Sequence, residues 1–355
     1  MFPLPDYIRY GSKHFFAPIY RHHNSQVFVF SLAAERQVLQ DLCDKCLNNL
    51  TSGFEYRALD YVTVIFHNVE RIDCGESDYA LKLDGEVLFL IPVVKIEKDF
   101  FKFLWGSVER FFLSPSEMAC VFVPYIFLDS SPGMVSGREL YGYPKEMGQI
   151  KFPQDQLNRE HGRLKPGDTF ELNLRAWEKE NGDVQRDETL LKITCLEEGG
   201  DQKIDEKGLT KIQTMAQSLS TILDAEIQRM FPLISDWFSL KPFKNLLSPT
   251  LHTVLLKQFR DVKEGTKACY QAVVEAEYSA ADFKNFELYF PSPPQVEVKI
   301  KPLESHPIAQ ELGLKSIAAD QPDTFQGSYW LWSKLNFELE EGEIIHESAV
   351  IPRRF

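Results

Sequence analysis

The stretch SGRELYGYPKEMG, Ser136–Gly148, holds a single lysine, Lys145, on an unusually stiff piece of backbone. Pro144 fixes its own φ and restricts Tyr143 before it to an extended conformation. A lysine that only meets solvent needs no such support, because its ammonium group is hydrated in many conformations. The stretch therefore indicates that the chain orients the amine of Lys145 for a specific task.

Strand-like segments lie on both sides of this stretch. Apolar residues recur there with a period of two, or in short unbroken runs, and the lysine segment itself is counted with them. These segments cover residues 25–32, 56–69, 79–96, 120–129, 168–198, 267–290, 293–303 and 328–348. The segment 168–198 is a hairpin with ENGD as its turn.

Two segments have helical periodicity instead, residues 33–50 and residues 209–234. Strand-like segments outnumber them, so the sequence predicts an α+β fold built on a large, mostly antiparallel β-sheet. No break in composition divides the chain, and we predict a single domain over residues 1–355.

The composition excludes several classes of partner. The net charge is −13 and the pI is about 5.2, a balance that repels nucleic acid and anionic membranes. No basic cluster is interleaved with aromatic residues. The N-terminal residues lack the pattern of a secretory signal, and the longest apolar runs are too short to span a bilayer. We expect a cytoplasmic protein that binds neither nucleic acid nor membrane.

Motifs for nucleotides and metals are also missing. The sequence has no phosphate-binding glycine loop, and the pair Cys43 and Cys46 lacks a second pair at zinc spacing. We interpret both thiols as residues of a helix that packs in the core. The only adjacent histidines, His22 and His23, would point to opposite sides of an extended segment. The sequence thus predicts neither a nucleotide-binding site nor a metal site.

The segment GRELYGYPKEMG resembles the signature of the acetoacetate decarboxylase family, G-R-E followed by Y-P-K-K-L-G. In that family the lysine forms a Schiff base with a β-keto acid. Upstream, GEVLFLIPV is similar to a family segment in which an active-site glutamate lies five residues before I-P-V. The resemblance implies that Lys145 is the nucleophile, and that Glu86 handles protons or positions the substrate.

The resemblance also implies a closed, barrel-like sheet with peripheral helices, and a homo-oligomer that acts on a small keto acid. The imine accepts electrons, so no cofactor is implied. Residues about 155–250 are longer than the family core, which predicts a helical insertion around residues 200–250. Candidates for contact with the substrate are Arg138, Tyr141, Tyr143 and Glu146. Arg138 could instead pair with Glu139 or Glu86, and the tyrosines would line the pocket.

An attacking lysine must lose its proton, although its usual pKa is ~10.4. Burial and nearby cations lower the pKa of a lysine, and acetoacetate decarboxylase is the established example of such activation. The family's second lysine is Glu146 here, a carboxylate that would counteract this effect if it paired with Lys145. On a strand, however, residues 145 and 146 point to opposite faces.

Two further positions depart from the family. Ser25, in HNSQ, takes the place of an arginine that meets the substrate carboxylate, and Val64 corresponds to an acidic residue. These departures predict a substrate other than acetoacetate. They leave three functions open: a decarboxylating Schiff-base lyase, an aldolase or dehydratase that uses the same imine, and a non-catalytic binding protein for a small ligand.

Overall fold

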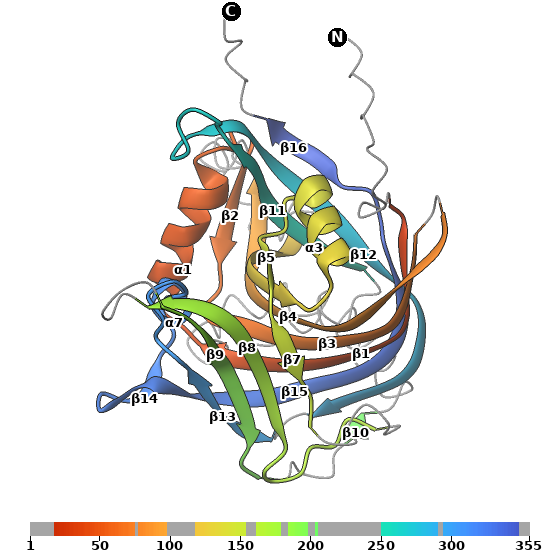
Figure 1. Ribbon diagram of the computed structural model, residues 1–355, viewed down its shortest axis with the longest axis vertical. Coiled ribbons are helices and arrows are strands. Elements are labelled where there is room, and N and C mark those ends of the chain that lie inside the picture. Colours follow the sequence, from red (N-terminus) through yellow and green to blue (C-terminus); the bar gives the residue numbers. More distant parts are fainter. Residues whose placement is uncertain are drawn as a thin grey trace, which may run out of the picture.

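The computed structural model describes residues 18–74, 77–97, 118–153, 161–178, 184–197, 203–204, 250–289 and 294–347. Seven of its strands close into a barrel (Figure 1). In order around the barrel they are β12 (Ala268–Tyr289), β11 (Thr250–Arg260), β5 (Met118–Leu128), β4 (Ser77–Glu97), β3 (Tyr61–Cys74), β1 (Tyr20–Ala33) and β15 (Gln321–Leu339). β15 then pairs with β12 and closes the ring. Only β5 and β11 run parallel within it, so the predicted mostly antiparallel, barrel-like sheet is confirmed.

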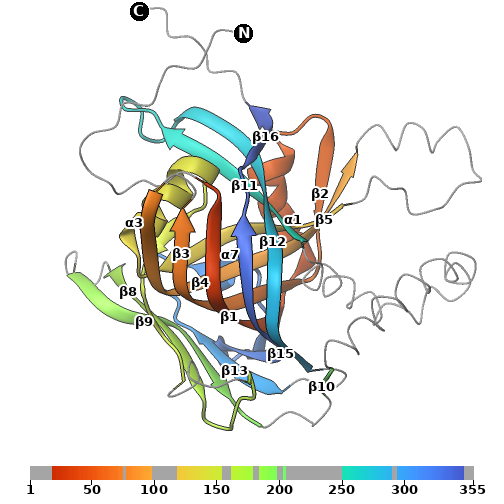
Figure 2. The same ribbon diagram turned by 90° about the vertical axis from the view of Figure 1, so that its right-hand side faces the viewer.

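Outside the barrel, the sheet continues from the N-terminal half of β15, which pairs with β13. There follow β13 (Gln295–Ile300), β9 (Val184–Cys195), β8 (Thr169–Glu178) and β7 (Gln149–Lys151), in the lower part of Figures 1 and 2. β8 and β9 pair as the predicted hairpin, while residues 179–183 at its turn lie outside the described part. This outer sheet covers one side of the barrel wall.

The remaining elements are short. The strands are β2 (Phe54–Ala58), β6 (Lys145–Met147), β10 (Lys203–Ile204), β14 (Ser316–Ala318) and β16 (Glu343–Glu347). The helices are α1 (Arg36–Cys43), α3 (Ser131–Ser136) and α7 (Ile308–Glu311), with π-helical turns η1 (Asp44–Asn48) and η2 (Gly137–Tyr141). The predicted helix at residues 209–234, and most of the predicted insertion, lie outside the described residues and stay predictions.

The barrel wall is buried on both faces, which gives the molecule two cores. Successive side chains of a strand point to opposite faces. Val29 and Ile65 therefore face the barrel interior, whereas Phe30 and Phe66 face the outer sheet. There both rings pack against Phe170 of β8, with centroid distances of 5.2 and 5.1 Å. Burial on both sides explains why these strands are near-continuous apolar runs rather than alternating ones.

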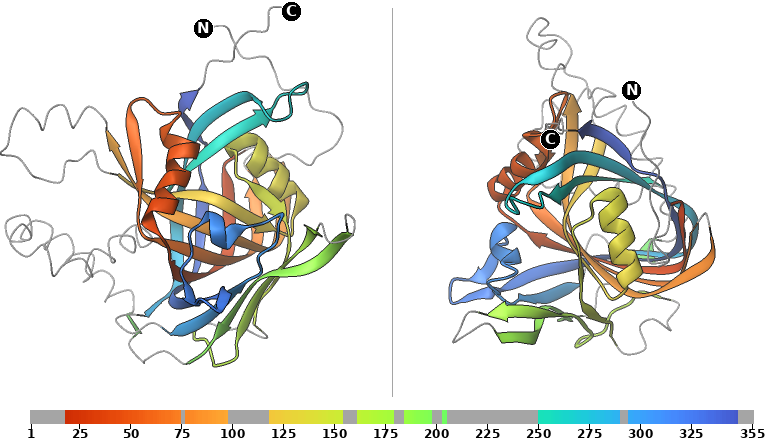
Figure 3. Two further views of the ribbon diagram at one scale, coloured as in Figure 1. Left: turned by 90° about the vertical axis from the view of Figure 1, so that its left-hand side faces the viewer. Right: turned by 45° about the horizontal axis from the view of Figure 1, so that its top comes forward.

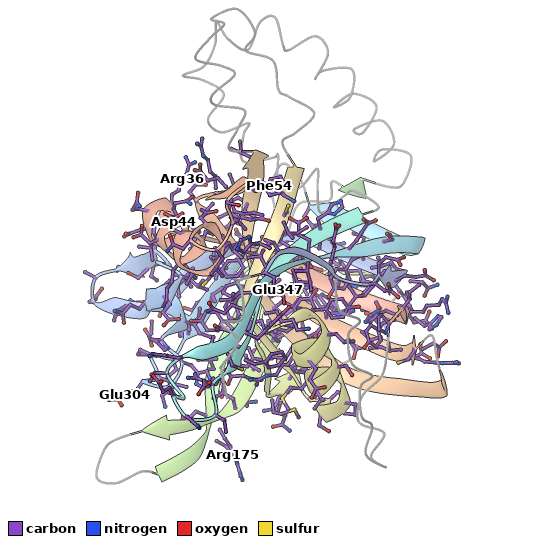
Figure 4. The ribbon with its side chains drawn as sticks, turned by 90° about the horizontal axis from the view of Figure 1, so that it is seen from above. Arg36, Asp44, Phe54, Arg175, Glu304 and Glu347 are labelled. Carbon is purple, nitrogen blue, oxygen red and sulfur yellow. The ribbon has the colours of Figure 1, made fainter. Side chains whose placement is uncertain are left out.

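The helix predicted within residues 33–50 is present as α1 followed by η1. Its buried side chains are Leu39, Cys43 and Leu47, and Leu42, Cys46 and Leu50 are partly buried against the same core. Figure 4 shows this helix at the periphery of the molecule, marked by Arg36 and Asp44. It covers the outer core and does not contribute to the barrel interior.

The lysine segment differs from its prediction as a strand, because only Lys145–Met147 forms one. The residues before it form α3 and η2, a helical unit that lies within the ring of barrel strands (Figure 3). α3 begins with a capping serine, since the Ser130 side chain accepts a hydrogen bond from the Gly133 N–H, and a proline follows in the first turn. Because of this helix-start signal, the residues before Lys145 form a helix and not the predicted strand.

Candidate active site

A tight turn carries the chain from α3 into β6. The Gly137 carbonyl accepts hydrogen bonds from the backbone N–H groups of Gly142 (3.1 Å) and Tyr143 (3.2 Å). Gly142 has a φ of 82°, and a Cβ on it would lie 2.4 Å from Cα of Lys257 on β11. The turn therefore needs glycine at position 142, for its backbone conformation as well as for space.

Contacts to its backbone fix the position of Lys145, and Gly137 leaves space for its side chain. It pairs with Ile126 of the parallel strand β5, and its carbonyl accepts a hydrogen bond from Arg138 Nη1 at 3.3 Å. Its side chain passes over Gly137, where a Cβ would lie 2.6 Å from the lysine Cε and 2.7 Å from its Cδ. The first glycine of the motif thus leaves the space that the lysine side chain occupies.

The Lys145 ammonium points into the barrel and meets a glutamate. Lys145 Nζ donates a hydrogen bond to Glu86 Oε1 at 2.9 Å, and the two side chains are only 14% and 10% exposed. The second oxygen, Glu86 Oε2, lies 3.4 Å from His67 Nδ1. His67 and Glu86 are cross-strand neighbours on β3 and β4. The result is a buried chain of three titratable groups, in the order lysine, glutamate, histidine.

The surroundings strongly lower the pKa values of Glu86 and His22. Burial alone would raise the pKa of Glu86, but the charge of Lys145 and the hydrogen bond with His67 outweigh it and lower the pKa to about 2. Glu86 is therefore ionised at neutral pH. Burial, with help from neighbouring His67, lowers the pKa of His22 to about 3, so His22 is neutral there.

The lowered pKa of Glu86 predicts a pH dependence of stability. Since the folded state holds this pKa below the usual 4.5, ionised Glu86 stabilises the protein above that pH. This contribution is lost as the pH falls from about 4.5 towards 2. The expected result is that the free energy of unfolding, measured with urea, drops less over this range in Glu86→Gln than in wild type. Glu264→Gln, at an exposed ion pair, should keep the wild-type dependence, and equal slopes in all three proteins would contradict the prediction.

The tyrosines of the motif lie in the wall of the barrel interior. Tyr143 is hydrogen-bonded through its hydroxyl to Thr253 Oγ1 at 3.1 Å, and its ring centroid lies 5.5 Å from Lys145 Nζ. The Tyr141 hydroxyl donates to the carbonyl of Glu340 at 2.7 Å. Burial raises the pKa of both tyrosines, which are therefore neutral phenols at physiological pH.

Inside the barrel is a cavity of about 190 Å³. Its polar lining residues include Lys145, Glu86, His67, His22 and Tyr143, which contact one another or lie side by side. Most of the remaining lining is aliphatic and comes from inward-facing positions of the barrel strands. Such a concave, mainly apolar site with a few convergent polar groups is typical of small-molecule binding.

The structure brings four of the predicted site residues to this cavity, namely Lys145, Glu86, Tyr141 and Tyr143. Arg138 and Glu146 are not among the described residues that line it. Glu146 Oε2 lies 3.0 Å from His306 Nε2, and this contact lowers the pKa of Glu146. Lys145 and Glu146 therefore have different partners, which is the arrangement expected for neighbours on a strand.

The two other departures from the family pattern differ in their positions. A bulge at Asn24, whose φ is 51°, changes the alternation of β1, so that Ser25 shares the inward side with Val27. Val64 is fully buried in the outer core, and its neighbour Ile65 lines the cavity instead. Position 64 is thus on the face of the wall away from the lysine.

Sequence reasoning missed two histidines of the cavity. His22 stacks on Phe337 at a centroid distance of 4.2 Å, and His67 contacts Glu86, as described above. His23 points the other way, towards Asp73, so the predicted divergence of the adjacent histidines is observed. Alternation along β1 and β3 was the available signal, but it does not tell which face of a strand is the inner one.

Within the described residues, no cluster of three or more histidine, cysteine, aspartate or glutamate side chains is arranged to hold a metal ion. A search of the same part of the chain for a helix with the length and apolarity to cross a membrane finds none.

Fold and site together define a class of protein: a closed, mixed β-barrel that buries a lysine–glutamate pair beside an apolar cavity. The family model of acetoacetate decarboxylase (ADC) matches residues 4–192. The chain belongs to the acetoacetate decarboxylase family, whose members are enzymes.

Solved structures share the fold. An acetoacetate decarboxylase from Legionella pneumophila is 15% identical and has a TM-score of 0.53, with 98% of this chain and 93% of that chain covered. A second acetoacetate decarboxylase structure is 12% identical with a TM-score of 0.50, and covers 94% of this chain and 92% of its own. At these identities the likeness extends to the fold alone. A comparison with curated proteins finds no match.

Proposed function

We propose that the protein is a Schiff-base-forming lyase that acts on a keto acid through an imine on Lys145. The observation that carries this proposal is the position of Lys145 Nζ, inside an apolar cavity and 2.9 Å from a carboxylate that itself contacts a histidine. A nucleophile beside a base that a third group orients is the arrangement expected for covalent catalysis.

Imine formation would use the three groups in turn. The Lys145 ammonium gives up its proton to water, since Glu86 with a pKa of about 2 is too weak a base to keep it, and the free amine attacks the keto carbon of the substrate. The carbinolamine then takes up a proton, relayed from solvent by His67 and Glu86, and loses its hydroxyl group as water. The product is a protonated imine in which nitrogen carries the positive charge.

Decarboxylation follows from the electron demand of that imine. The bond between the α-carbon and the carboxylate breaks, CO₂ leaves, and the electron pair moves into an enamine that neutralises the nitrogen. A proton is added to the α-carbon, water hydrolyses the imine, and the ketone and free Lys145 are released. The imine itself serves as the electron sink, so the proposal includes no metal or organic cofactor.

One observation favours a second candidate, an aldolase or dehydratase that uses the same imine. The buried Glu86–His67 pair offers a proton relay beside the imine, which is what bond formation or loss of water at the neighbouring carbons requires. A non-catalytic binding protein is the third possibility, and it would need the cavity but not the reactivity of Lys145. A cytoplasmic location and a homo-oligomeric state stay predictions.

The test is borohydride trapping with a panel of keto acids at about pH 6 to 10, a range that brackets shifted and unshifted lysines. We expect a stable adduct on Lys145, located by intact mass and peptide mapping. Release of CO₂ from the same substrates supports the decarboxylase, and adducts without CO₂ release favour the aldolase or dehydratase. If no keto acid is trapped anywhere in this range, the binding protein is the better description.

A further inference from the structure

The apolar part of the cavity comes from strands all around the barrel. All seven strands contribute at least one aliphatic side chain each, for example Val29, Ile65, Leu90, Val123, Leu251, Ala280 and Leu331. Together with the polar residues around Lys145, they enclose a cavity of about 190 Å³. Because the lining residues come from strands all around the barrel, the cavity extends well beyond the surroundings of Lys145.

The aliphatic part of this cavity is a poor site for water and a good site for an apolar group. Water in a cavity needs two to four polar partners, whereas an apolar cavity of about 150 Å³ stays dry and takes up benzene. The cavity here, with its polar end included, measures about 190 Å³, so its aliphatic part has room for a group of similar size. A short, polar substrate such as acetoacetate would leave most of the aliphatic wall without contacts.

The charges of the lining limit the substrate further. Among the described residues that line the cavity, Lys145 is the only lysine or arginine, and Glu86 neutralises it. His22 is neutral at physiological pH, as shown above. Each anionic group of a substrate therefore adds a desolvation cost in this cavity, and a second carboxylate or a phosphate would raise that cost further.

Polar recognition is available at one place. His67 Nε2 and His22 Nδ1 are buried and have no hydrogen-bond partner in the described structure. The two rings are 6.2 Å apart, and both line the cavity next to the Lys145–Glu86 pair. Buried polar atoms of this kind are usually satisfied, so their state indicates a ligand with one compact polar head group.

We propose that the substrate is a keto compound with a single polar head, held by Lys145 and the two histidines, and with an apolar chain or ring of about six or more carbons along the barrel interior. The assignment of the head rests on the proposed imine chemistry. The assignment of the apolar group rests on the cavity alone. Medium-chain 3-oxo acids and aryl-substituted 3-oxo acids fit this description, whereas oxo-dicarboxylates and phosphorylated keto compounds do not.

The test is a homologous series of 3-oxo acids from acetoacetate to 3-oxododecanoate, with benzoylacetate and an oxo-dicarboxylate added. We expect the concentration for half-maximal trapping to fall about four-fold per methylene until the cavity is full. Val123→Phe, which narrows the cavity, should move the optimum to shorter homologues. Ile317→Phe, at a residue 49% exposed on β14, is the matched control and should keep the wild-type optimum.

Calorimetry with saturated acids, from butanoate to dodecanoate, separates the two proposals because it needs no imine. Trapping that is independent of chain length, or strongest with acetoacetate or the dicarboxylate, overturns this inference and leaves the imine chemistry intact. Saturated acids that bind more tightly with length, while no keto acid is trapped, support the apolar occupant and overturn the proposed function.

Discussion

Lys145→Arg is expected to abolish borohydride trapping of keto acids completely and to lower turnover by about 10³-fold or more, the scale on which loss of a nucleophile acts. A guanidinium group stays protonated and cannot form an imine. It keeps a positive charge beside Glu86, so the buried carboxylate is not left unpaired and the fold should survive. Circular dichroism and urea unfolding check the fold, and intact mass checks the adduct.

The chain offers an internal control for this experiment. Lys95 is also a buried lysine paired with a glutamate, since its Nζ lies 2.7 Å from Glu275 Oε1. It is not among the residues that line the cavity. Peptide mapping of the wild type should find the adduct on Lys145 and none on Lys95. An adduct that persists in Lys145→Arg, or that maps to Lys95, would show that the trapping is unrelated to the site.

Gly137→Ala should displace the side chain of Lys145 without removing it. The added methyl would lie 2.6 Å from Lys145 Cε, and the flexible lysine can move away from it more easily than the backbone. Gly137 has ordinary helical dihedrals, φ −65° and ψ −39°, so alanine is compatible with the backbone and stability should change by no more than about 1 kcal/mol. A displacement of about 1 Å costs on the order of 10²-fold in rate, and we expect the trapping rate to fall accordingly.

The rate constant for adduct formation, measured at saturating keto acid, is the readout. Gly53→Ala is the matched control, because a Cβ on Gly53 meets nothing within 4 Å. It should react at the wild-type rate. The role assigned to Gly137 would be wrong if Gly137→Ala reacted as fast as Gly53→Ala while both variants were folded.

Much of the fold follows from local patterns in the sequence. Period-two and continuous apolar runs predict the strands, and the ENGD turn predicts the hairpin of β8 and β9. The apolar stripe of residues 33–50 predicts α1 and η1. The strand prediction was wrong before Lys145, where the helix-start signal at Ser130 to Pro132 decides the local structure. Closure of the barrel has no local signal, because it joins β15 to β1 and β12 over long stretches of chain.

The same division applies to the site. The resemblance to the family's segments implies Lys145 and Glu86, and the structure joins them at 2.9 Å. His67 and His22 depend on which face of β3 and β1 turns inward, and a shift of one residue would reverse it. The bulge at Asn24 changes that alternation within β1 itself. The sequence of an isolated strand does not determine which of its faces turns towards the barrel interior.

The sequence by itself determined the strands, the family signature and the stiff backbone around Lys145, since these depend on residues close together in the chain. Only the tertiary structure decided that Glu86 contacts the lysine and His67 contacts Glu86, that the partner of Glu146 is His306, and that a mainly aliphatic cavity lies beside them. The physical reason is that cross-strand register and barrel closure are set by the burial of both faces of the wall at once. That burial sums contacts over the whole chain, and no short segment contains it.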